Sequence, residues 1–300
     1  ELACKNELNS DVVYSKLEEI LDITNIDVCV IATTAPYHKD LIIKSIAAGI
    51  KTILCEKPLA TSINDCNELI AYAEKHHAKI AINHQMRYME QYIVPKQLLS
   101  SPEFGGLQSI TVNAGNFGMA MNGIHYIEML RFMTDDSPKS ITAWFDIDDL
   151  PNPRGIEFKD KSGSIKITTE TGKTLYLNAS SHHGHGVVVN YIAKYGQIIV
   201  DELTGMMYET CRNSNEREFP TIRYGQPHVT KISQIPSVDI ITSTQKVIQE
   251  LLDGDNYPNL HDASAAIKTL VAGYVSDENN HQSININDSR IEQDRVFPWA

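Results

Sequence analysis

The fold is decided by the stretch Ile53-Leu54-Cys55-Glu56-Lys57-Pro58-Leu59-Ala60, in which an apolar strand ends abruptly at an acid, a lysine and a proline. Open α/β sheets bind their ligands just beyond the carboxyl ends of their strands, so we expect chemistry at this point. Pro58 has a fixed φ and disfavours helical backbone at Lys57. The direction in which the lysine side chain leaves the strand is therefore restricted.

Short apolar runs alternate with helical patterns on both sides of this stretch. Strands are expected at 28–32, 51–55 and 80–83, and helices lie between them, the second opened by Ser62 as an N-cap. Such alternation indicates βαβ units and a parallel sheet. From residue 107 onward most segments alternate apolar and polar residues instead, which is typical of an antiparallel sheet with one covered face. We therefore predict an α/β fold with one domain at 1–90 and an α+β domain at 91–300.

One part of a dinucleotide site is missing from the sequence. A sheet of this kind opens with a strand, a glycine-rich turn and a helix, yet Gly-x-Gly-x-x-Gly occurs nowhere in the 300 residues. Either residues that precede Glu1 carry this turn, or the protein has lost half of a cofactor site. We favour the first interpretation. The choice between NAD and NADP is not encoded in the residues present.

Composition narrows the possible partners. The formal net charge of -12 argues against nucleic acid and against an acidic membrane surface, because both require a basic face. No apolar run approaches the ~20 residues of a membrane span. The five cysteines show neither metal spacing nor an obvious pairing, which favours reduced thiols and a cytoplasmic location.

Further motifs surround the Glu56-Lys57-Pro58 turn in a fixed order. Before it lies the run Val28-Cys29-Val30-Ile31-Ala32-Thr33-Thr34-Ala35-Pro36-Tyr37-His38, and after it come Asn83-His84-Gln85-Met86-Arg87-Tyr88 and Gly123-Ile124-His125. As an ordered set, these motifs resemble the Gfo/Idh/MocA family of oxidoreductases related to glucose-fructose oxidoreductase and inositol dehydrogenase. The resemblance implies a Rossmann-type domain at 1–90, N-terminally incomplete. It also implies a substrate-binding and oligomerisation domain at 91–300 with an open-faced sheet.

The resemblance also implies which residues form the site. Lys57 becomes the electrophile or acid and His125 the base that exchanges the alcohol proton; partial burial would bring the pKa of the lysine into a useful range. The alternatives are a surface lysine and a core histidine. The residues expected to contact the cofactor lie after the parallel strands, where ordinary turn chemistry is the alternative. They are Thr33, Thr34, Tyr37, His38, Glu56, Lys57 and Gln85.

Two more residues are candidates for the substrate. Arg87 could clamp a carboxylate, a phosphate or a sugar hydroxyl, or it could form an ordinary salt bridge between domains. His183 belongs to the run His182-His183-Gly184-His185, of which only the second and last histidine point to the same side of a strand. Because no acid or cysteine accompanies them at ligand spacing, we predict no metal site. The resemblance implies that this strand end borders the substrate cavity, so we expect His183 to contact a sugar.

One departure from the family pattern concerns His125. The family places an aspartate four residues before this histidine, and this chain has Met121 there. A thioether cannot accept a strong hydrogen bond from the ring. We therefore carry three hypotheses. The first is an NAD- or NADP-dependent oxidoreductase of carbohydrate metabolism that acts on a secondary alcohol carbon of a sugar, nucleotide-sugar or polyol. In this hypothesis the protein is a homo-oligomer, a dimer or tetramer, whose copies associate through the second sheet. The second is a cofactor-sensing regulator without turnover, and the third is an NAD-dependent glycosidase.

Overall fold

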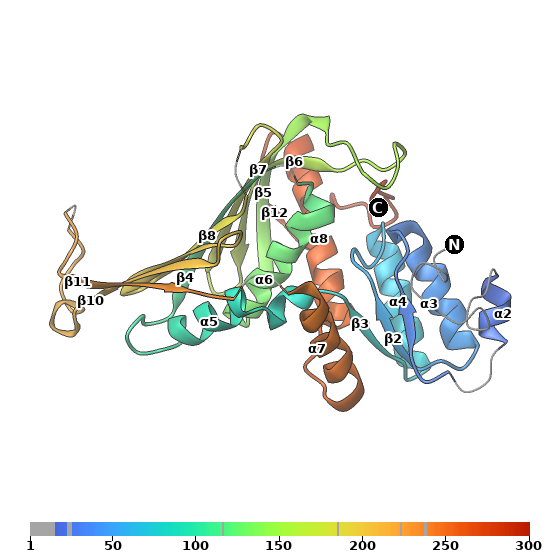
Figure 1. Ribbon diagram of the computed structural model, residues 1–300. Coiled ribbons are helices and arrows are strands. Elements are labelled where there is room, and N and C mark those ends of the chain that lie inside the picture. Colours follow the sequence, from blue (N-terminus) through green and yellow to red (C-terminus); the bar gives the residue numbers. More distant parts are fainter. Residues whose placement is uncertain (1–15, 23–25, 116, 185, 223, 237–238) are drawn as a thin grey trace.

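The computed structural model describes residues 16–22, 26–115, 117–184, 186–222, 224–236 and 239–300. Its first sheet holds three parallel strands in the order β1 (Cys29–Ile31), β2 (Thr52–Cys55) and β3 (Lys79–Ile82). The connections form βαβ units, because helix α3 (His38–Ala47) follows β1 and helix α4 (Ile63–Lys75) follows β2 (Figure 1). The short helix α2 (Leu17–Leu21) precedes them, and a 3₁₀ turn, η2 (Ala35–Tyr37), leads into α3.

The predicted start of α4 is confirmed by its N-cap. The side chain of Ser62 accepts a hydrogen bond from the backbone N–H of Asp65, which satisfies one of the unpaired donors of the first turn. Strands β2 and β3 are buried through Ile53, Ile80 and Ile82, which pack in the main core. Strand β1 contributes only Ile31 to it, and its Val30 is exposed. The parallel order and the helical crossovers confirm the predicted Rossmann-type arrangement of this part of the chain.

The second sheet has nine strands in the order β11-β10-β9-β8-β4-β7-β6-β5-β12. Each pair of neighbours is antiparallel except β4 and β7, which run parallel, so the prediction of a largely antiparallel sheet is confirmed. The strands are β4 (Leu107–Gly115), β5 (Pro138–Asp149), β6 (Lys161–Thr169), β7 (Thr174–Ser180), β8 (Val188–Ala193), β9 (Gly196–Asp201), β10 (Met206–Arg212), β11 (His228–Gln234) and β12 (Ile284–Asn285).

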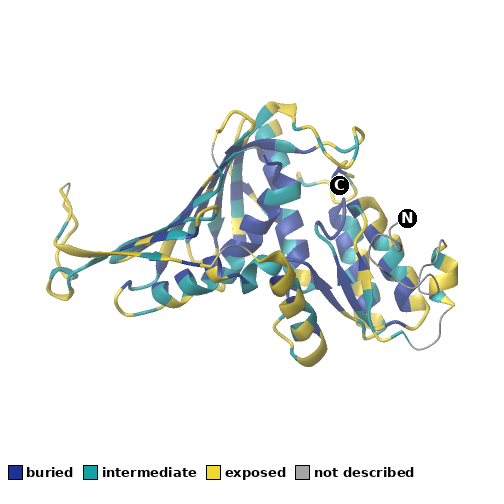
Figure 2. Cartoon of the chain, in the orientation of Figure 1, coloured by how far each residue is buried: buried dark blue, intermediate teal, exposed yellow. Residues whose placement is uncertain are grey.

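Helices cover only one face of this second sheet. Helices α6 (Ile124–Thr134) and α8 (Leu260–Glu278) pack on it, and Figure 2 shows the buried layer between them and the strands. Strand register places Tyr208 opposite Ile232 and Tyr176 opposite Thr111 on the other face, where both tyrosines are exposed. The face away from the helices is therefore open.

The two sheets meet through helical segments. A 3₁₀ turn, η3 (Gln85–Tyr88), leaves β3 and leads into α5 (Glu90–Leu99), and a π-helical turn, η4 (Met119–Gly123), leads into α6. Helix α7 (Ile240–Asp253) packs on β2, β3 and η3, so a C-terminal element covers the first sheet (Figure 1). The short η5 (Ser214–Glu216) lies in the connection between β10 and β11. The boundary that we predict at residue 90 stays a prediction.

Two further findings concern the described residues as a group. None of their helices is long and apolar enough to cross a membrane. Four cysteines, Cys29, Cys55, Cys66 and Cys211, are free thiols.

Candidate active site

Lys57 lies at the carboxyl end of β2 and reaches across to the second half of the chain. Its ammonium group donates a hydrogen bond to the backbone carbonyl of Met121 in the π-helical turn η4. Burial lowers the pKa of Lys57 to about 8, and the guanidinium of Arg154 contributes in the same direction. A lysine with such a pKa exchanges protons readily near neutral pH, which a solvated lysine does not.

His125 lies in the first turn of α6, four residues after Met121. It is buried, and Nδ1 is sealed from solvent without a hydrogen-bond partner among the described residues. Burial, followed by the charge of Lys57 and by His84, holds the pKa of His125 well below its ordinary value. The ring is therefore neutral at pH 7. Because Lys57 contacts the carbonyl of Met121, one helical turn before His125, the ends of β2 and η4 bring the two predicted catalytic groups into one neighbourhood.

His84 is a member of this group that the sequence reasoning did not select. Its ring packs edge-on against that of His125, with 5.3 Å between the centroids. Both ring nitrogens are buried without a partner among the described residues, and burial, aided by Arg87 and Lys57, lowers the pKa of His84 to about 3. Packing against His84, rather than a hydrogen-bonded carboxylate, fixes the ring plane of His125. The position of His84, two residues after the end of β3, was the sequence signal that could have selected it.

Asp160 supplies a buried carboxylate close to Met121. Its two oxygens accept hydrogen bonds from the backbone N–H groups of Ala120 at 3.0 Å and Met121 at 2.8 Å. Burial raises the pKa of Asp160 to about 6, against these hydrogen bonds and the attraction of Lys57. The carboxylate thus holds the turn whose carbonyl receives Lys57. Sequence reasoning did not select Asp160, which lies in a polar connection but is buried.

A cavity of about 360 Å³ opens beside His125. Its polar lining comes from Gln85, Asn122, His125 and Glu202, and its apolar lining comes from methionine, aromatic and aliphatic side chains. The carboxamide oxygen of Gln85 is buried without a partner among the described residues. Lys57 does not itself line this cavity. Its ammonium group contacts the backbone carbonyl of Met121, which is also outside the cavity lining. The cavity is large enough for a small polyhydroxy compound.

The predicted cofactor residues lie at the carboxyl ends of the parallel strands, as Figure 1 allows the reader to follow. Thr33 and Tyr37 are exposed and Thr34 is half-buried, in the turn after β1. Glu56 follows β2 and accepts a hydrogen bond of 2.7 Å from the side chain of Asn83, which follows β3. Together with Lys57 and Gln85, these groups share one edge of the sheet. Their contact with a cofactor stays a prediction.

His38 differs from the other predicted cofactor residues. It is fully buried, with Nδ1 2.8 Å from the carbonyl oxygen of Pro58 and Nε2 3.1 Å from that of Thr33. Burial lowers its pKa, so the ring is neutral and donates only one of these two hydrogen bonds. Both ring nitrogens face backbone carbonyls. The side chain therefore ties the β1 turn to the β2 turn, and its fit to a cofactor is poor.

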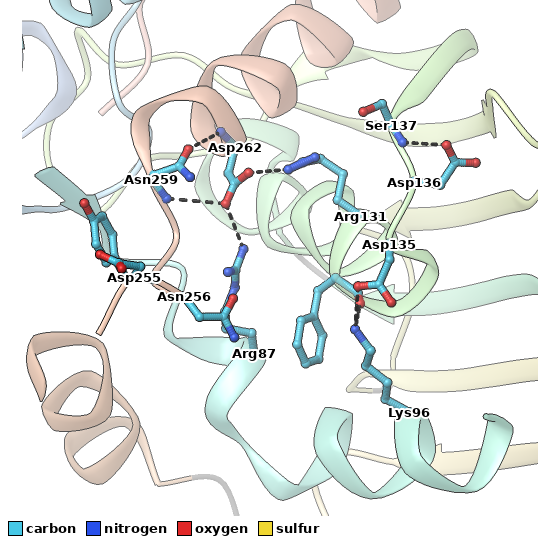
Figure 3. Close-up of a pocket in the computed structure, with 12 residues that line it drawn as sticks. Arg87, Lys96, Arg131, Asp135, Asp136, Ser137, Asp255, Asn256, Asn259 and Asp262 are labelled. Atoms are coloured by element: carbon cyan, nitrogen blue, oxygen red, sulfur yellow. Dashed lines mark hydrogen bonds and ion pairs between the residues drawn. The ribbon is translucent and has the colours of Figure 1, made fainter. Parts of the chain in front are cut away.

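Arg87 lies in a buried ion network rather than in the cavity beside His125. Its guanidinium contacts Glu128 and, at 3.2 Å, Asp262, which in turn pairs with Arg131 (Figure 3). Burial is the largest single influence and would lower the pKa of Arg87, but Glu128 and Asp262 together outweigh it and raise that pKa. The arrangement matches the salt-bridge alternative that the sequence left open. A separate polar cavity of about 500 Å³ opens on this network.

His183 is exposed after β7, and its Nδ1 lies 2.9 Å from the carbonyl oxygen of Ala114. The adjacent Gly115 lines the cavity beside His125, whereas His183 does not. Its contact with a sugar stays a prediction. Within the described ranges, which omit His185, no group of three or more histidine, cysteine or acidic residues could hold a metal ion.

Comparison with known proteins matches this arrangement of strands and turns. The family model "Oxidoreductase family, NAD-binding Rossmann fold", that of Gfo/Idh/MocA proteins, matches residues 1–84. This segment is therefore similar to the Gfo/Idh/MocA family. The predicted resemblance is therefore confirmed, and with it the Rossmann fold of the first part of the chain.

The curated relatives include inositol 2-dehydrogenase of Klebsiella pneumoniae strain 342, which is 23% identical over 170 residues, 51% of this chain and 50% of the relative. The chain matches about half the length of such relatives, between 42% and 50% for three of them.

Solved structures share the whole fold at low identity. One is an oxidoreductase from Agrobacterium radiobacter in complex with NAD⁺, L-tartaric acid and magnesium, with a TM-score of 0.75, 17% identity and coverage of 95% of this chain and 86% of that one. Another is the super-repressor mutant of Gal80p from Saccharomyces cerevisiae, with a TM-score of 0.74, 14% identity and coverage of 96% and 87%. These likenesses support the fold of both halves.

Proposed function

We propose that the protein is an NAD(P)-dependent oxidoreductase that exchanges hydride with a secondary alcohol carbon of a sugar, nucleotide-sugar or polyol. The observation that carries this proposal is that His125 of α6 lines a cavity of small-molecule size, while Lys57, after β2, contacts the backbone of Met121 one helical turn before it. Two titratable groups whose pKa values are both lowered mainly by burial, one of which lines a cavity, are typical of a catalytic site. The relatives named inositol 2-dehydrogenase point to the same substrate class.

The residues present fit half of a dinucleotide. A bound nicotinamide would supply the hydride acceptor or donor. Thr33, Thr34, Tyr37 and Glu56 lie where its ribose and ring would be held, and the unpartnered carboxamide oxygen of Gln85 is available to a donor. The glycine turn that would hold the pyrophosphate does not occur in the 300 residues. The proposal therefore concerns the nicotinamide half of the cofactor and makes no choice between NAD and NADP.

The chain's own residues handle the proton. Neutral His125 accepts the hydroxyl proton of an alcohol, but its imidazolium is costly because burial and Lys57 both oppose a second positive charge. Lys57, with a pKa of about 8, is the neighbouring group that can take the proton on when it is a free amine. In the reducing direction the ammonium form returns it. Asp160 positions both groups indirectly, since it holds the backbone of Met121.

The test follows the absorbance of reduced nicotinamide with NAD or NADP and a panel of inositols, aldoses and nucleotide-sugars. We expect turnover with at least one polyol and a loss of about 10²- to 10⁴-fold in kcat/KM for Lys57→Met and for His125→Asn. Lys96→Met, which removes a lysine at the surface of the other cavity, is the matched control and should keep full activity. Turnover that survives both site variants would refute the assignment.

A second candidate function is a cofactor-binding regulator without turnover. The observation that favours it is Met121, which offers His125 no carboxylate and whose carbonyl engages Lys57. Tight binding of a nicotinamide cofactor together with no hydride transfer to or from any compound of the panel would decide for this candidate.

We also propose that two copies associate through the open face of the second sheet, and that the protein works in the cytoplasm. The open face carries exposed Trp144, Tyr176, Tyr208 and Ile232, which strand register places on one side. A mixed aromatic and aliphatic surface of this kind is typical of an interface. Sedimentation velocity should find a dimer or tetramer, and Tyr176→Glu should shift it toward the monomer.

A further inference from the structure

Glu202 is a half-buried acid that the proposed proton chemistry does not use. It follows β9, and its backbone N–H donates a 3.0 Å hydrogen bond to the carbonyl oxygen of Val187, which fixes its place in the wall of the cavity beside His125. Gln85 and Asn122, which lie much earlier in the sequence, also line this cavity. One cavity thus joins the end of β3, the start of α6 and the turn after β9.

Two buried tyrosines hold the Glu202 carboxylate. Oε1 accepts a hydrogen bond of 2.5 Å from the hydroxyl of Tyr92, and Oε2 accepts one of 2.9 Å from the hydroxyl of Tyr126. Tyr126 is itself fixed by stacking on Phe117, with 5.8 Å between ring centroids. Because each carboxylate oxygen has two acceptor positions, both oxygens keep one position that the tyrosines do not fill.

No cation balances this carboxylate among the residues that the structure describes. The ion pairs found there do not include Glu202, and its charged neighbour is another acid, Asp201. Burial accordingly raises the pKa of Glu202 to about 7, against the two tyrosine hydrogen bonds. A carboxylate that is largely removed from water and has open acceptor positions gains stability from a donor that enters the cavity.

We propose that Glu202 is a specificity-determining residue that accepts hydrogen bonds from hydroxyl groups of a neutral polyol, at carbons away from the one that faces His125. The proposal rests on the proposed function, because it takes the same cavity as the substrate site. Apolar neighbours such as Met86, Met89 and Ile240 would exclude water from this pairing and strengthen it. The bridging tyrosines keep the carboxylate in one orientation, so the position of the accepted hydroxyl is selected.

The experiment is a double-mutant cycle between protein and substrate. The wild type and Glu202→Gln are assayed with the best polyol of the panel and with its monodeoxy analogues. In the wild type we expect one analogue to lose about 10- to 100-fold in kcat/KM, as for a hydrogen bond to a charged group. In Glu202→Gln the parent polyol should lose a similar factor, and that analogue should lose no more.

The control is Glu209→Gln, which neutralises a buried acid of the same sheet that pairs with Lys231 outside this cavity. It should leave both substrates unaffected. Glutamine can keep both tyrosine partners, so Glu202→Gln should fold; thermal melting checks this. Tyr126→Phe, which frees one oxygen of the carboxylate, is the second variant and should reduce discrimination between the parent and the analogue.

Each outcome separates this proposal from the function on which it rests. Equal losses for the parent and every analogue in Glu202→Gln would mean a structural role and would overturn the proposal while turnover stands. A preference for an aminodeoxy analogue over the parent would overturn the neutral polyol in favour of a cationic ligand. If no compound is turned over, calorimetric titration of the same compounds gives the same comparison. A binding pattern that ignores position 202, or no binding, would overturn the proposal there.

Discussion

The buried ion network around Arg87 gives a sharp prediction of stability. Glu128 is 3% exposed and Arg87 10%, and Glu128 keeps only a longer contact of 3.5 Å to Arg131 when Arg87 is removed. We consider the substitution Arg87→Met, which keeps the length of the apolar stem but removes the guanidinium. It leaves a buried acid with one weak partner, which is the costly half of a broken ion pair.

The expected loss of unfolding free energy is about 3 kcal/mol, the low end of the range of about 3–5 kcal/mol for a buried pair, because Arg131 remains. Burial raises the pKa of Glu128 even with Arg87 present, so the intact pair does not fully repay the desolvation of that acid. The double variant Arg87→Met with Glu128→Leu should therefore recover at least about 2 kcal/mol, since no unpaired charge is left.

Urea unfolding followed by circular dichroism measures these values, with the m-value checked for constancy. Lys96→Met is the matched control in the same cavity: its partner Asp135 is 78% exposed, so the loss should stay below about 1 kcal/mol. Suppose instead that Arg87→Met costs less than about 1 kcal/mol and raises the KM of the polyol at least tenfold. Arg87 would then be a substrate ligand, and the network argument would be wrong.

Three further predictions concern the site itself. Gly118→Ala should lower the unfolding free energy by about 1–3 kcal/mol because its methyl group would collide with the Asp160 carboxylate, whereas Gly184→Ala, in open space, should change it little; chemical denaturation compares them. The pKa of Glu202 is about 7 in the folded protein and 4.5 ordinarily, so its contribution to the unfolding free energy falls as pH rises between these values. The unfolding free energy of Glu202→Gln relative to the wild type should therefore rise by about 2–3 kcal/mol from pH 4.5 to pH 8. For Lys57 we expect kcat/KM of alcohol oxidation to rise with pH to a plateau with a midpoint near 8, and Lys57→Met should abolish that midpoint in the pH–rate profile; a profile that stays flat in the wild type would contradict the proposed proton transfer.

Local patterns were enough to predict the first sheet and the place of Lys57. The strand before Glu56 is a continuous apolar run, and a buried parallel strand needs nothing else to be recognised. The start of α4 was predictable because the N-cap Ser62 and its partner Asp65 are three residues apart. The hairpin of β10 and β11 was not predicted, since nearly every residue of His228–Gln234 is exposed and no alternation of apolar and polar residues marks it.

The missed site residues share a different cause. Asp160 precedes β6 in a polar connection, and Glu202 stands in an acidic turn after β9, where carboxylates are normally solvated. One hydrogen-bond partner of Glu202 is Tyr92, 110 positions earlier in the chain. No window of sequence contains both partners, so the contact is invisible to periodicity. The resemblance supplied Lys57 and His125, but it could not supply a group that stands outside the quoted motifs.

The parallel pairing of β4 with β7 has a consequence for the growing polypeptide. Strand β4 is the first strand of the second sheet to be synthesised, yet its two neighbours are β7 and β8. Leu107–Gly115 therefore has no paired strand until residues 174–180 leave the ribosome, and its second edge stays unpaired until residues 188–193 follow. Pairings over such sequence separations form slowly and leave strand edges exposed meanwhile. A nascent chain arrested before β7 therefore leaves both edges of β4 unpaired. Chaperone demand should be greatest during synthesis of this middle third.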